Sequence, residues 1–556
     1  MSALLLEKPV ATDACPRCGD LAKLVETLQE EVGQLRREVA TLRAEAGYWK
    51  SRHADAVKRN QQLQAELHQA RGEIRQLKDK LFGRKSERRL AGEDLAKLVE
   101  DGGRSPARKR GGQPGHRGHR RIDYSHRPAV EEIRALPVEE RRCERCGKPR
   151  LEMTDTEDSE QIEIEVRAHR RVIRRKRYRA VCDCPDRPLC VTAPPTPKLI
   201  PKGIYGISVW VYLLLDKFSS HRPTARLIEQ LRLEGLPLAA GTIAAGFERL
   251  ELLLEPIYQA LVVRNRQGEF HQADETRWMV YVEQEGKLGY RWWLWVVVSR
   301  ETVVYLLDPS RSHDVPEEHF SQQASGILLV DRYSAYKAMS QVKLGSLRLA
   351  FCWSHVRRDF LEVDKGFQEL VPWALDWLRR IRDVYHPNRQ RIAYQAGTKE
   401  FIEHHARLRE QLGEMQQRAE EELAGSKLRL PCRKVLESLQ NHWEGLVRFV
   451  DRPEVPMDNN GSERILRNPA LGRKNYYGSG SLWSGRLTAT MFSILATLGL
   501  WNLNPRAWLS WYFEQCAANG GKAPDDIERF LPWNLSEEQL APLRLTPAEP
   551  PFLDSS

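Results

Sequence analysis

The segment GEFHQADET, residues 268–276, opens the part of the chain with the strongest signal for a β-sheet. It is followed by RWMVYVEQ, YRWWLWVVVS and TVVYLLD, apolar stretches with short turns between them that predict an antiparallel meander of three strands. Farther on, GILLVDRYSAY, residues 326–336, contains an unbroken apolar run, typical of a strand buried on both faces. We expect Asp274 at the end of the first strand and Asp331 at the end of the buried strand, so their carboxylates converge if the strands are neighbours.

A third acid, Glu463, lies in the stretch MDNNGSERILRN, where Asp458-Asn459-Asn460 predicts a helix start. Carboxylate oxygens are the ligands that magnesium prefers, and two such ions can hold both sides of a phosphodiester. The pattern therefore favours metal-dependent phosphoryl transfer with Asp274, Asp331 and Glu463 as catalytic and metal-binding residues. Acids at strand ends also serve as caps or surface groups, and the residues alone leave that alternative open.

Composition limits the class of protein. A chain of 556 residues is long enough for several domains, and its net charge of +11 is a modest basic excess. It has no apolar run of ~20 residues and no apolar leader after a basic start, so we expect a cytoplasmic protein with no membrane span or signal peptide. Its 10 cysteines include close pairs that indicate metal ligands rather than disulfides.

Residues 21–82 carry an unbroken heptad pattern after a terminus, 1–20, that we expect to be disordered. Valine at a positions, leucine at d positions and Asn60 at an a position favour a parallel two-stranded coiled coil that joins protomers. The alternative is a long amphipathic helix packed on its own chain.

A basic arm rich in glycine and proline follows at residues 83–130, with ARKRGGQPGHRGHRR inside it. Such an arm can lie in a DNA groove and neutralise phosphates, which makes Arg110, Arg117 and Arg120 candidate DNA contacts. The alternative is a solvated linker.

Residues 131–195 contain two cysteine pairs, Cys143 with Cys146 and Cys182 with Cys184, around a hairpin predicted from QIEIEVRA and VIRRKRYRAVC. Four thiolates at these positions predict a zinc ribbon in which a structural zinc ion supplies folding energy. Cys190 is a substitute ligand, and four unligated thiols are the alternative. Basic residues crowd the module, and the candidate DNA contacts among them are Arg174, Arg175 and Arg177. Cys15 and Cys18 are left without a role.

Residues 196–262 are predicted to be helical, and LEGLPLAAGT is either the turn of a helix-turn-helix or part of a packing domain. Helix formers also fill residues 361–450, between Asp331 and Glu463, which indicates a helical insertion. Residues 501–556 form a C-terminal element.

Eight motifs follow one another along the chain: LFGRKSER, GGQPGHRGH, the two cysteine pairs, ADET, LLVDRYSAY, CWSHVRRDF, DNNGSER and GRKNYYGS. In these motifs, up to about residue 515, the chain resembles the insertion-sequence-66 family of bacterial transposases. The resemblance implies a zipper-like N-terminus, a zinc finger and, over 263–500, a ribonuclease-H-like DDE catalytic domain. It also implies that Asp274, Asp331 and Glu463 are the DDE triad.

The expected fold is therefore a multidomain α/β protein: a ribonuclease-H-like core with a helical insertion, an N-terminal coiled coil and a small zinc ribbon. The expected function is excision and integration of an insertion sequence at its terminal inverted repeats, with Mg²⁺ or Mn²⁺ at the triad. The partners would be double-stranded DNA, further copies of the chain and small accessory proteins of the same element, in the cytoplasm at the nucleoid. A nuclease without strand transfer and a non-catalytic DNA-binding protein derived from a transposase are the alternatives.

Four further basic residues are weaker candidates for DNA contact. Arg357 and Arg358, in CWSHVRRDF, would meet scissile phosphates or form structural ion pairs on a helix. Arg473 and Lys474 follow the glutamate helix, where a polyanion must approach the triad.

Overall fold

The structure is a computed structural model that describes residues 16–82, 135, 137–142, 145–149, 166, 168–179, 190–283, 289–321 and 325–545. The arm at 83–130 lies outside the described residues, as do residues 1–15 of the expected disordered terminus. Contacts within the chain define two compact units. The first combines Met1–Lys85 with Val356–Ser438, and the second combines Ser86–His355 with Leu439–Ser556.

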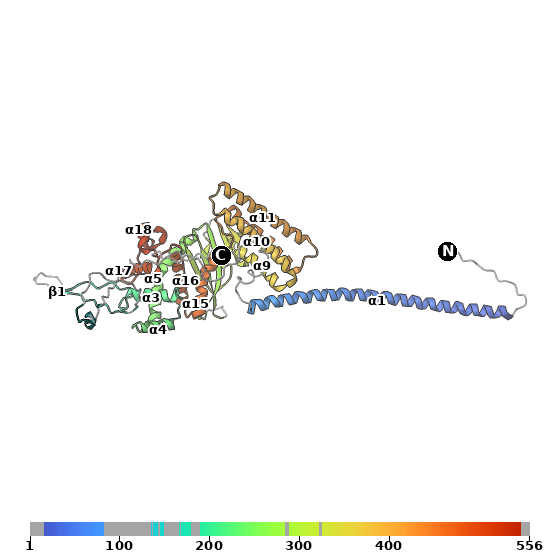
Figure 1. Cartoon of the computed structure of the whole chain (residues 1–556), viewed down its shortest axis with the longest axis horizontal. Helices are drawn as coiled ribbons and strands as arrows, with labels where there is room; N and C mark the ends of the chain where they lie inside the picture. The colour runs from blue at the N-terminus through green and yellow to red at the C-terminus, as the bar shows by residue number, and fades with distance from the viewer. Residues whose placement is uncertain are drawn as a thin grey trace. The chain divides into compact units, whose positions relative to one another are not determined.

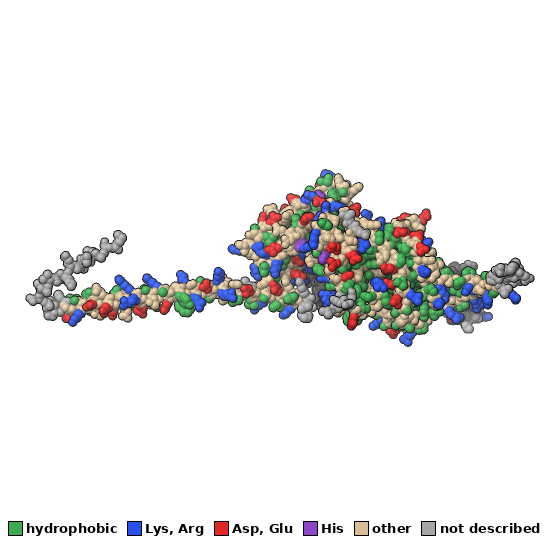
Figure 2. All heavy atoms as spheres, turned by 180° about the vertical axis from the view of Figure 1, so that it is seen from behind, with side chains coloured by type: hydrophobic (Ala, Val, Ile, Leu, Met, Phe, Trp, Pro, Cys, Tyr) green, Lys and Arg blue, Asp and Glu red, His purple; other side chains and the backbone are tan. Residues whose placement is uncertain are grey.

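The first unit contains helix α1, Pro16–Phe82, which runs without interruption through the heptad region (Figure 1). Acidic and basic side chains alternate along it, and its heptad leucines and valines are exposed (Figure 2). The other long helices of this unit are α10, Val371–Arg391, and α11, Lys399–Ala424. Two further helices, α9, Trp353–Gly366, and α12, Leu430–Asn441, lie mostly within it, and the short turn η3, Gln368–Leu370, connects α9 to α10.

Aromatic residues hold the helices of the first unit together. Phe360 stacks on Trp377 with 5.4 Å between ring centroids, and Trp373 Nε1 donates a hydrogen bond to Glu422 at 2.6 Å. The last turns of α1 pack on the same unit, because a Cβ placed on Gly72 would lie 2.0 Å from the ring of Phe367. Only a glycine lets the helix approach this closely.

The second unit is built on one mixed sheet flanked by helices (Figure 1). Its strands are β3, Phe270–Val280; β4, Arg291–Val298; β5, Val303–Asp308; β6, Gly326–Val330; β7, Leu347–Phe351; and β8, Gly478–Ser479. Its longer helices are α3, Ile207–Phe218; α4, Thr224–Leu233; α5, Ala240–Arg266; α15, Asn460–Tyr476; α16, Leu482–Leu500; and α17, Pro505–Ala518. Its short helices are α6, Asp314–His319; α7, Ser334–Ala338; α8, Ser340–Lys343; α13, Trp443–Leu446; α14, Arg448–Asp451; and α18, Glu537–Leu540. No helix in the described part of the chain is long and apolar enough to cross a membrane.

The strand order is β5-β4-β3-β6-β7, and β8 pairs with β3. Strands β3, β4 and β5 pair antiparallel, so the meander expected from the sequence is confirmed. Strand β6 lies parallel to both β3 and β7, and its apolar run is buried, as predicted. The sheet is therefore mixed, and the α/β class is confirmed.

Asp274 does not lie at the end of its strand, so that prediction was wrong. Strand β3 continues past it to Val280, because β4 pairs with β3 without a break from Gln272 to Met279. The parallel pairing with β6 covers only Phe270 to Gln272. Asp274 thus lies just beyond the part of β3 that β6 shares.

Both edges of the main sheet are covered by polar side chains of neighbouring segments. At β5, the backbone N–H of Val303 donates to Thr497 Oγ1 at 3.0 Å and that of Tyr305 donates to Ser493 Oγ at 2.8 Å. At β7, the carbonyl of Leu349 accepts a hydrogen bond from Arg448 Nε at 3.0 Å. These contacts satisfy backbone groups that have no strand neighbour.

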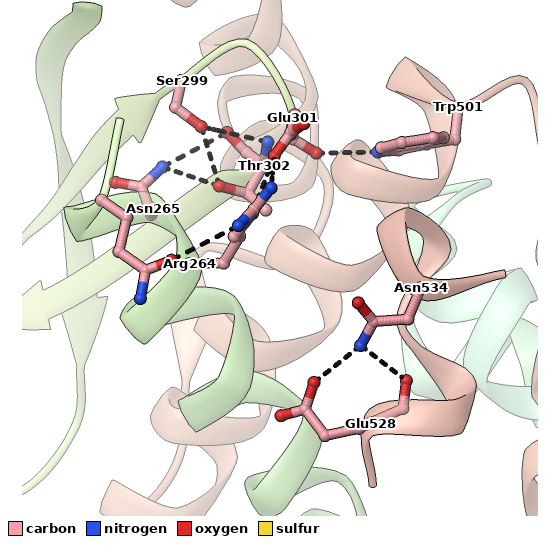
Figure 3. Close-up of polar contacts among 9 residues, drawn as sticks. Arg264, Asn265, Ser299, Glu301, Thr302, Trp501, Glu528 and Asn534 are labelled. Atoms are coloured by element: carbon pink, nitrogen blue, oxygen red, sulfur yellow. Dashed lines mark hydrogen bonds and ion pairs between the residues drawn. The ribbon is translucent and has the colours of Figure 1, made fainter. Parts of the chain in front are cut away.

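A buried polar network joins Asn265, at the end of α5, to Ser299 and Thr302 in the turn between β4 and β5 (Figure 3). Asn265, at the end of α5, donates to the carbonyl of Val297 at 3.2 Å and to Thr302 Oγ1 at 3.1 Å. The carbonyl of Asn265 lies 2.6 Å from His271 Nε2 on β3, and its Oδ1 lies 2.8 Å from His319 Nε2. Because Asn265 is fully buried, its polar groups need these partners, and the bonds fix the position of β3 relative to α5 and β4.

The described part of the cysteine module contains a small two-stranded sheet. Strand β1, Arg177–Arg179, pairs antiparallel with β2, Cys190–Thr192. The strand expected to pair with this segment, QIEIEVRA at 161–168, lies almost wholly outside the described residues, so that pairing stays a prediction. Of the expected zinc ligands, Cys143, Cys182 and Cys184 lie outside the described residues, while Cys146 is exposed.

Candidate active site

Asp274 and Asp331 come from neighbouring parallel strands. The pairing of β3 with β6 aligns Gln272 with Leu329, and continuing this register by two residues aligns Asp274 with Asp331. Asp331 follows the last residue of β6, as predicted, and its Oδ1 accepts a hydrogen bond from the backbone N–H of Tyr333 at 2.9 Å. That bond fixes the turn that carries its carboxylate.

Glu463 lies in the first turn of α15, which begins at Asn460, as the Asp-Asn-Asn pattern predicted. The start of this helix is fastened to β3 by two hydrogen bonds. Asn459 Nδ2 donates to the carbonyl of Ala273 at 2.8 Å, and the N–H of Ser462 donates to Gln272 Oε1 at 3.2 Å. These bonds place the first turn of α15 beside the strand that carries Asp274.

The electrostatics of Asp274 show that the acids influence one another. Burial, together with the charges of Glu275, Asp331 and Glu463, raises the pKa of Asp274 to about 7, although the N–H of Glu275 opposes the shift by donating to Asp274 Oδ1 at 2.8 Å. The site therefore concentrates negative charge in a buried setting, which a cation would relieve. Carboxylate oxygens are the ligands that magnesium and manganese prefer, although the group of possible ligand atoms found within 4.8 Å of one another in the described residues is Cys352, His355 and Glu463 rather than the three acids.

Sequence reasoning missed the role of Glu275. Its carboxylate accepts hydrogen bonds from Arg311 Nε at 2.9 Å and from the Tyr336 hydroxyl at 3.0 Å, and the Arg311 guanidinium lies over the ring of Tyr333 at 4.0 Å. Burial raises the pKa of Glu275, and Arg311 opposes that shift. The pair holds the loop after β5 against the helix that follows Asp331. The motif ADET contains the acid, but nothing in the sequence marks Arg311 as its partner.

Cys352 and His355 were also missed as a pair. Cys352 lies between β7 and α9, and its Sγ accepts a hydrogen bond from the N–H of Asn459 at 3.2 Å. His355 Nε2 is 3.8 Å from Glu463 Oε1, and the His355 carbonyl accepts a hydrogen bond from Arg332 at 3.2 Å. The spacing Cys-x2-His in CWSHVRRDF was the available signal, because it places both side chains near one end of a helix.

The remaining predicted site residues are spread over several elements. Arg473 and Lys474 lie in the last turn of α15, where Arg473 donates to Thr276 Oγ1 at 2.8 Å and so also supports β3. Arg357 and Arg358 lie on α9 in the first unit. In the cysteine module, Arg174, Arg175 and Arg177 are exposed, as are most of the described residues around them. Residues of the arm, Arg110, Arg117 and Arg120, lie outside the described residues.

Comparison with known proteins identifies the family to which this chain belongs. Residues 202–487 match the Transposase IS66 family, and the chain belongs to this family. The match contains Asp274, Asp331 and Glu463.

Relatives come from Sinorhizobium fredii (strain NBRC 101917 / NGR234). The uncharacterized protein y4jD is 27% identical over 535 residues, which cover 93% of this chain and 98% of y4jD. The uncharacterized protein y4hP is 24% identical over 424 residues, covering 72% of this chain and 75% of y4hP. The first relative therefore spans nearly the whole chain.

Proposed function

We propose that this chain is a DNA transposase that excises and integrates an insertion sequence by metal-dependent phosphodiester hydrolysis and strand transfer. The observation that carries the proposal is the parallel register of β3 with β6, which aligns Asp274 with Asp331 when it is continued by two residues, together with the hydrogen bond from Asn459 that ties the start of the Glu463 helix to β3. The strand order, three antiparallel strands followed by two parallel ones, supports a ribonuclease-H-like core. Membership of the family supports the same function.

Asp274, Asp331 and Glu463 would hold Mg²⁺ or Mn²⁺. A bound ion supplies Lewis acidity and a nucleophilic water or 3′-hydroxyl at neutral pH. The residues of the chain orient the reaction: Asp331 is fixed by the N–H of Tyr333, and α15 is fixed on β3 through Asn459. Hydrolysis at the element end and attack of the new 3′-hydroxyl on target DNA are both in-line displacements at phosphorus, so one site serves both.

DNA would be held outside the triad by basic residues. Arg174, Arg175 and Arg177 of the cysteine module, the basic arm and Lys474 are suited to phosphates, which position DNA rather than read its sequence. We assign binding of the terminal inverted repeats to the cysteine module and the basic arm. The module would be a zinc ribbon held by Cys143, Cys146, Cys182 and Cys184.

Helix α1 would join two copies of the chain as a parallel coiled coil. Its heptad leucines and valines are exposed along the helix, and a second helix would bury them. Pairing would bring two catalytic sites to the two ends of one element, in a nucleoid-associated complex that small accessory proteins complete.

The test is cleavage and joining of a labelled element-end duplex with magnesium. We expect Asp274→Ala, Asp331→Ala and Glu463→Ala each to lower the rate by at least about a thousandfold while DNA binding persists, because each removes a metal ligand. Asp308→Ala is the matched control, since this acid ends β5 in the same sheet. If the wild-type protein binds the duplex but never cuts it, even with accessory proteins, the chain is a DNA-binding protein derived from a transposase.

A further inference from the structure

A second group of possible metal ligands adjoins the triad. Cys352, His355 and Glu463 each offer one ligand atom, and these atoms all lie within 4.8 Å of one another. Cys352 and His355 lie at the start of α9, and Glu463 lies at the start of α15, so two helix N-termini meet at the group. Sulfur, imidazole and carboxylate are together a set of ligands that zinc accepts.

The sulfur of Cys352 lies in a setting that suits a thiolate ligand. Besides the N–H of Asn459, the backbone N–H groups of Ser354 and His355 donate toward Sγ. Donors of this kind, with the positive end of a helix dipole, stabilise negative charge on sulfur. Burial works in the opposite direction and outweighs these donors, so the pKa of the Cys352 thiol is raised to about 11. A bound cation would make the thiolate favourable.

Two further features favour an ion at this group. The Oδ1 atom of Asn459, a residue 1% exposed, has no hydrogen-bond partner among the described residues, although its Nδ2 and its backbone N–H both donate. A buried oxygen of this kind is where an ion or an ordered water belongs. The side chains of His355 and Glu463 are 22% and 32% exposed, which leaves a route from solvent.

We propose that Cys352, His355 and Glu463 form a zinc-class site that competes with the catalytic metal for Glu463. Magnesium avoids sulfur, whereas zinc accepts three such ligands and leaves a fourth position to water. The thiol proton leaves to solvent when the ion binds. An ion in this site occupies the Glu463 carboxylate, so a thiophilic metal would switch off a magnesium-dependent reaction. The competition rests on the proposed function, but the binding site does not.

The first experiment counts bound metal. The full-length protein is equilibrated with Zn²⁺, or with Co²⁺ as a spectroscopic substitute, and the metal bound per chain is measured. We expect Cys352→Ser to bind one equivalent less than wild type, and Cys432→Ser, a change at another buried thiol, to bind as much as wild type. Subtracting the variants removes any contribution of the predicted zinc ribbon. Equal counts in wild type and Cys352→Ser would overturn the proposal.

A second variant guards against misfolding of Cys352→Ser. If that protein loses its cooperative thermal transition, His355→Gln carries the test, because its side chain is partly exposed. It too should lose one equivalent or weaken cobalt binding by at least about tenfold, and its sulfur-to-cobalt absorption should be weaker than that of wild type by the contribution of this one site. An unchanged band and unchanged affinity would sink the proposal.

The second experiment measures competition. In the magnesium-dependent cleavage assay, added zinc should inhibit the wild-type protein at a concentration at least about tenfold lower than it inhibits Cys352→Ser, each relative to its own rate without zinc. Equal inhibition of both proteins would overturn the competition. If no cleavage occurs at all, the proposed function fails, and the metal count still tests the site.

Discussion

Helix α1 and strand β6 both carry regularly placed apolar residues, but those of β6 are buried and those of α1 are exposed. In β6, Leu328 and Leu329 are completely buried between β3 and β7. In α1, Leu28 and Leu35 remain 49% and 57% exposed. An apolar pattern thus identifies a face that needs covering, and it does not say whether the cover comes from the same chain. The strand is covered by residues of its own chain, whereas most of the apolar face of the helix is exposed in the single chain.

The largest difference in stability should appear when a charged residue replaces a leucine in β6 and, separately, in α1. Leu328→Asp buries a carboxylate without a partner, which costs at least about 4 kcal/mol and should abolish the cooperative unfolding transition of the second unit. Leu35→Asp should leave that transition in place and weaken self-association, as measured by calorimetry and sedimentation velocity. If Leu35→Asp destabilises the second unit as much as Leu328→Asp does, the apolar face of α1 is covered by residues of its own chain.

The next effect concerns the acid that the sheet buries. Asp274 has its ordinary pKa of 3.8 when unfolded and a pKa of about 7 when folded without metal. Below pH 3.8 both states are protonated and there is no penalty. As pH rises to about 7 only the unfolded state ionises, so folding loses up to about 4 kcal/mol, and the loss persists above pH 7.

Asp274→Asn should therefore raise the melting temperature of the metal-free protein at pH 8 and change it little at pH 4. Asp55→Asn, on the exposed surface of α1, is the control and should change neither. Thermal denaturation across this pH range checks both variants. A gain for Asp274→Asn that is the same at pH 4 and pH 8 would show that ionisation of the buried carboxylate is not its cause.

The smallest effect compares two glycines of α1. Gly72→Leu should cost about 1–3 kcal/mol of packing, because its Cβ would meet the ring of Phe367, whereas Gly47 has nothing within 4 Å. Gly47→Leu should instead stabilise the helix by up to about 1 kcal/mol. Hydrogen exchange of the α9 peptides reports the difference: faster exchange for Gly72→Leu and no change for Gly47→Leu. Similar exchange in both variants would show that α1 does not depend on this contact.

The sequence allowed the local features of the site to be predicted. The unbroken run in β6 predicted a buried strand that ends at Asp331, and Asp-Asn-Asn predicted the start of α15 before Glu463. Both predictions depend on residues that are close in the sequence. Periodicity also predicted the meander and the helical character of α1.

The features that could not be predicted depend on contacts between distant residues. The polar residues of ADETR suggested the end of a strand. However, β4 pairs with the backbone of β3 throughout this stretch, so Asp274 lies inside β3. The bond from Asn459 to Ala273 joins residues 186 positions apart, and no local pattern contains it. The pairing of Arg311 with Glu275 is of the same kind.

The two outer strands of the sheet are hydrogen-bonded by side chains of nearby helices: Ser493 and Thr497 of α16 bind β5, and Arg448 of α14 binds β7. These contacts affect how copies of this chain can associate. A sheet with bare edges can recruit strands from other molecules and grow into aggregates. In this sheet these three edge groups are already engaged within the chain. A strand from another copy could pair with these parts of β5 and β7 only after their hydrogen bonds were broken, which disfavours growth of the sheet by edge-to-edge addition.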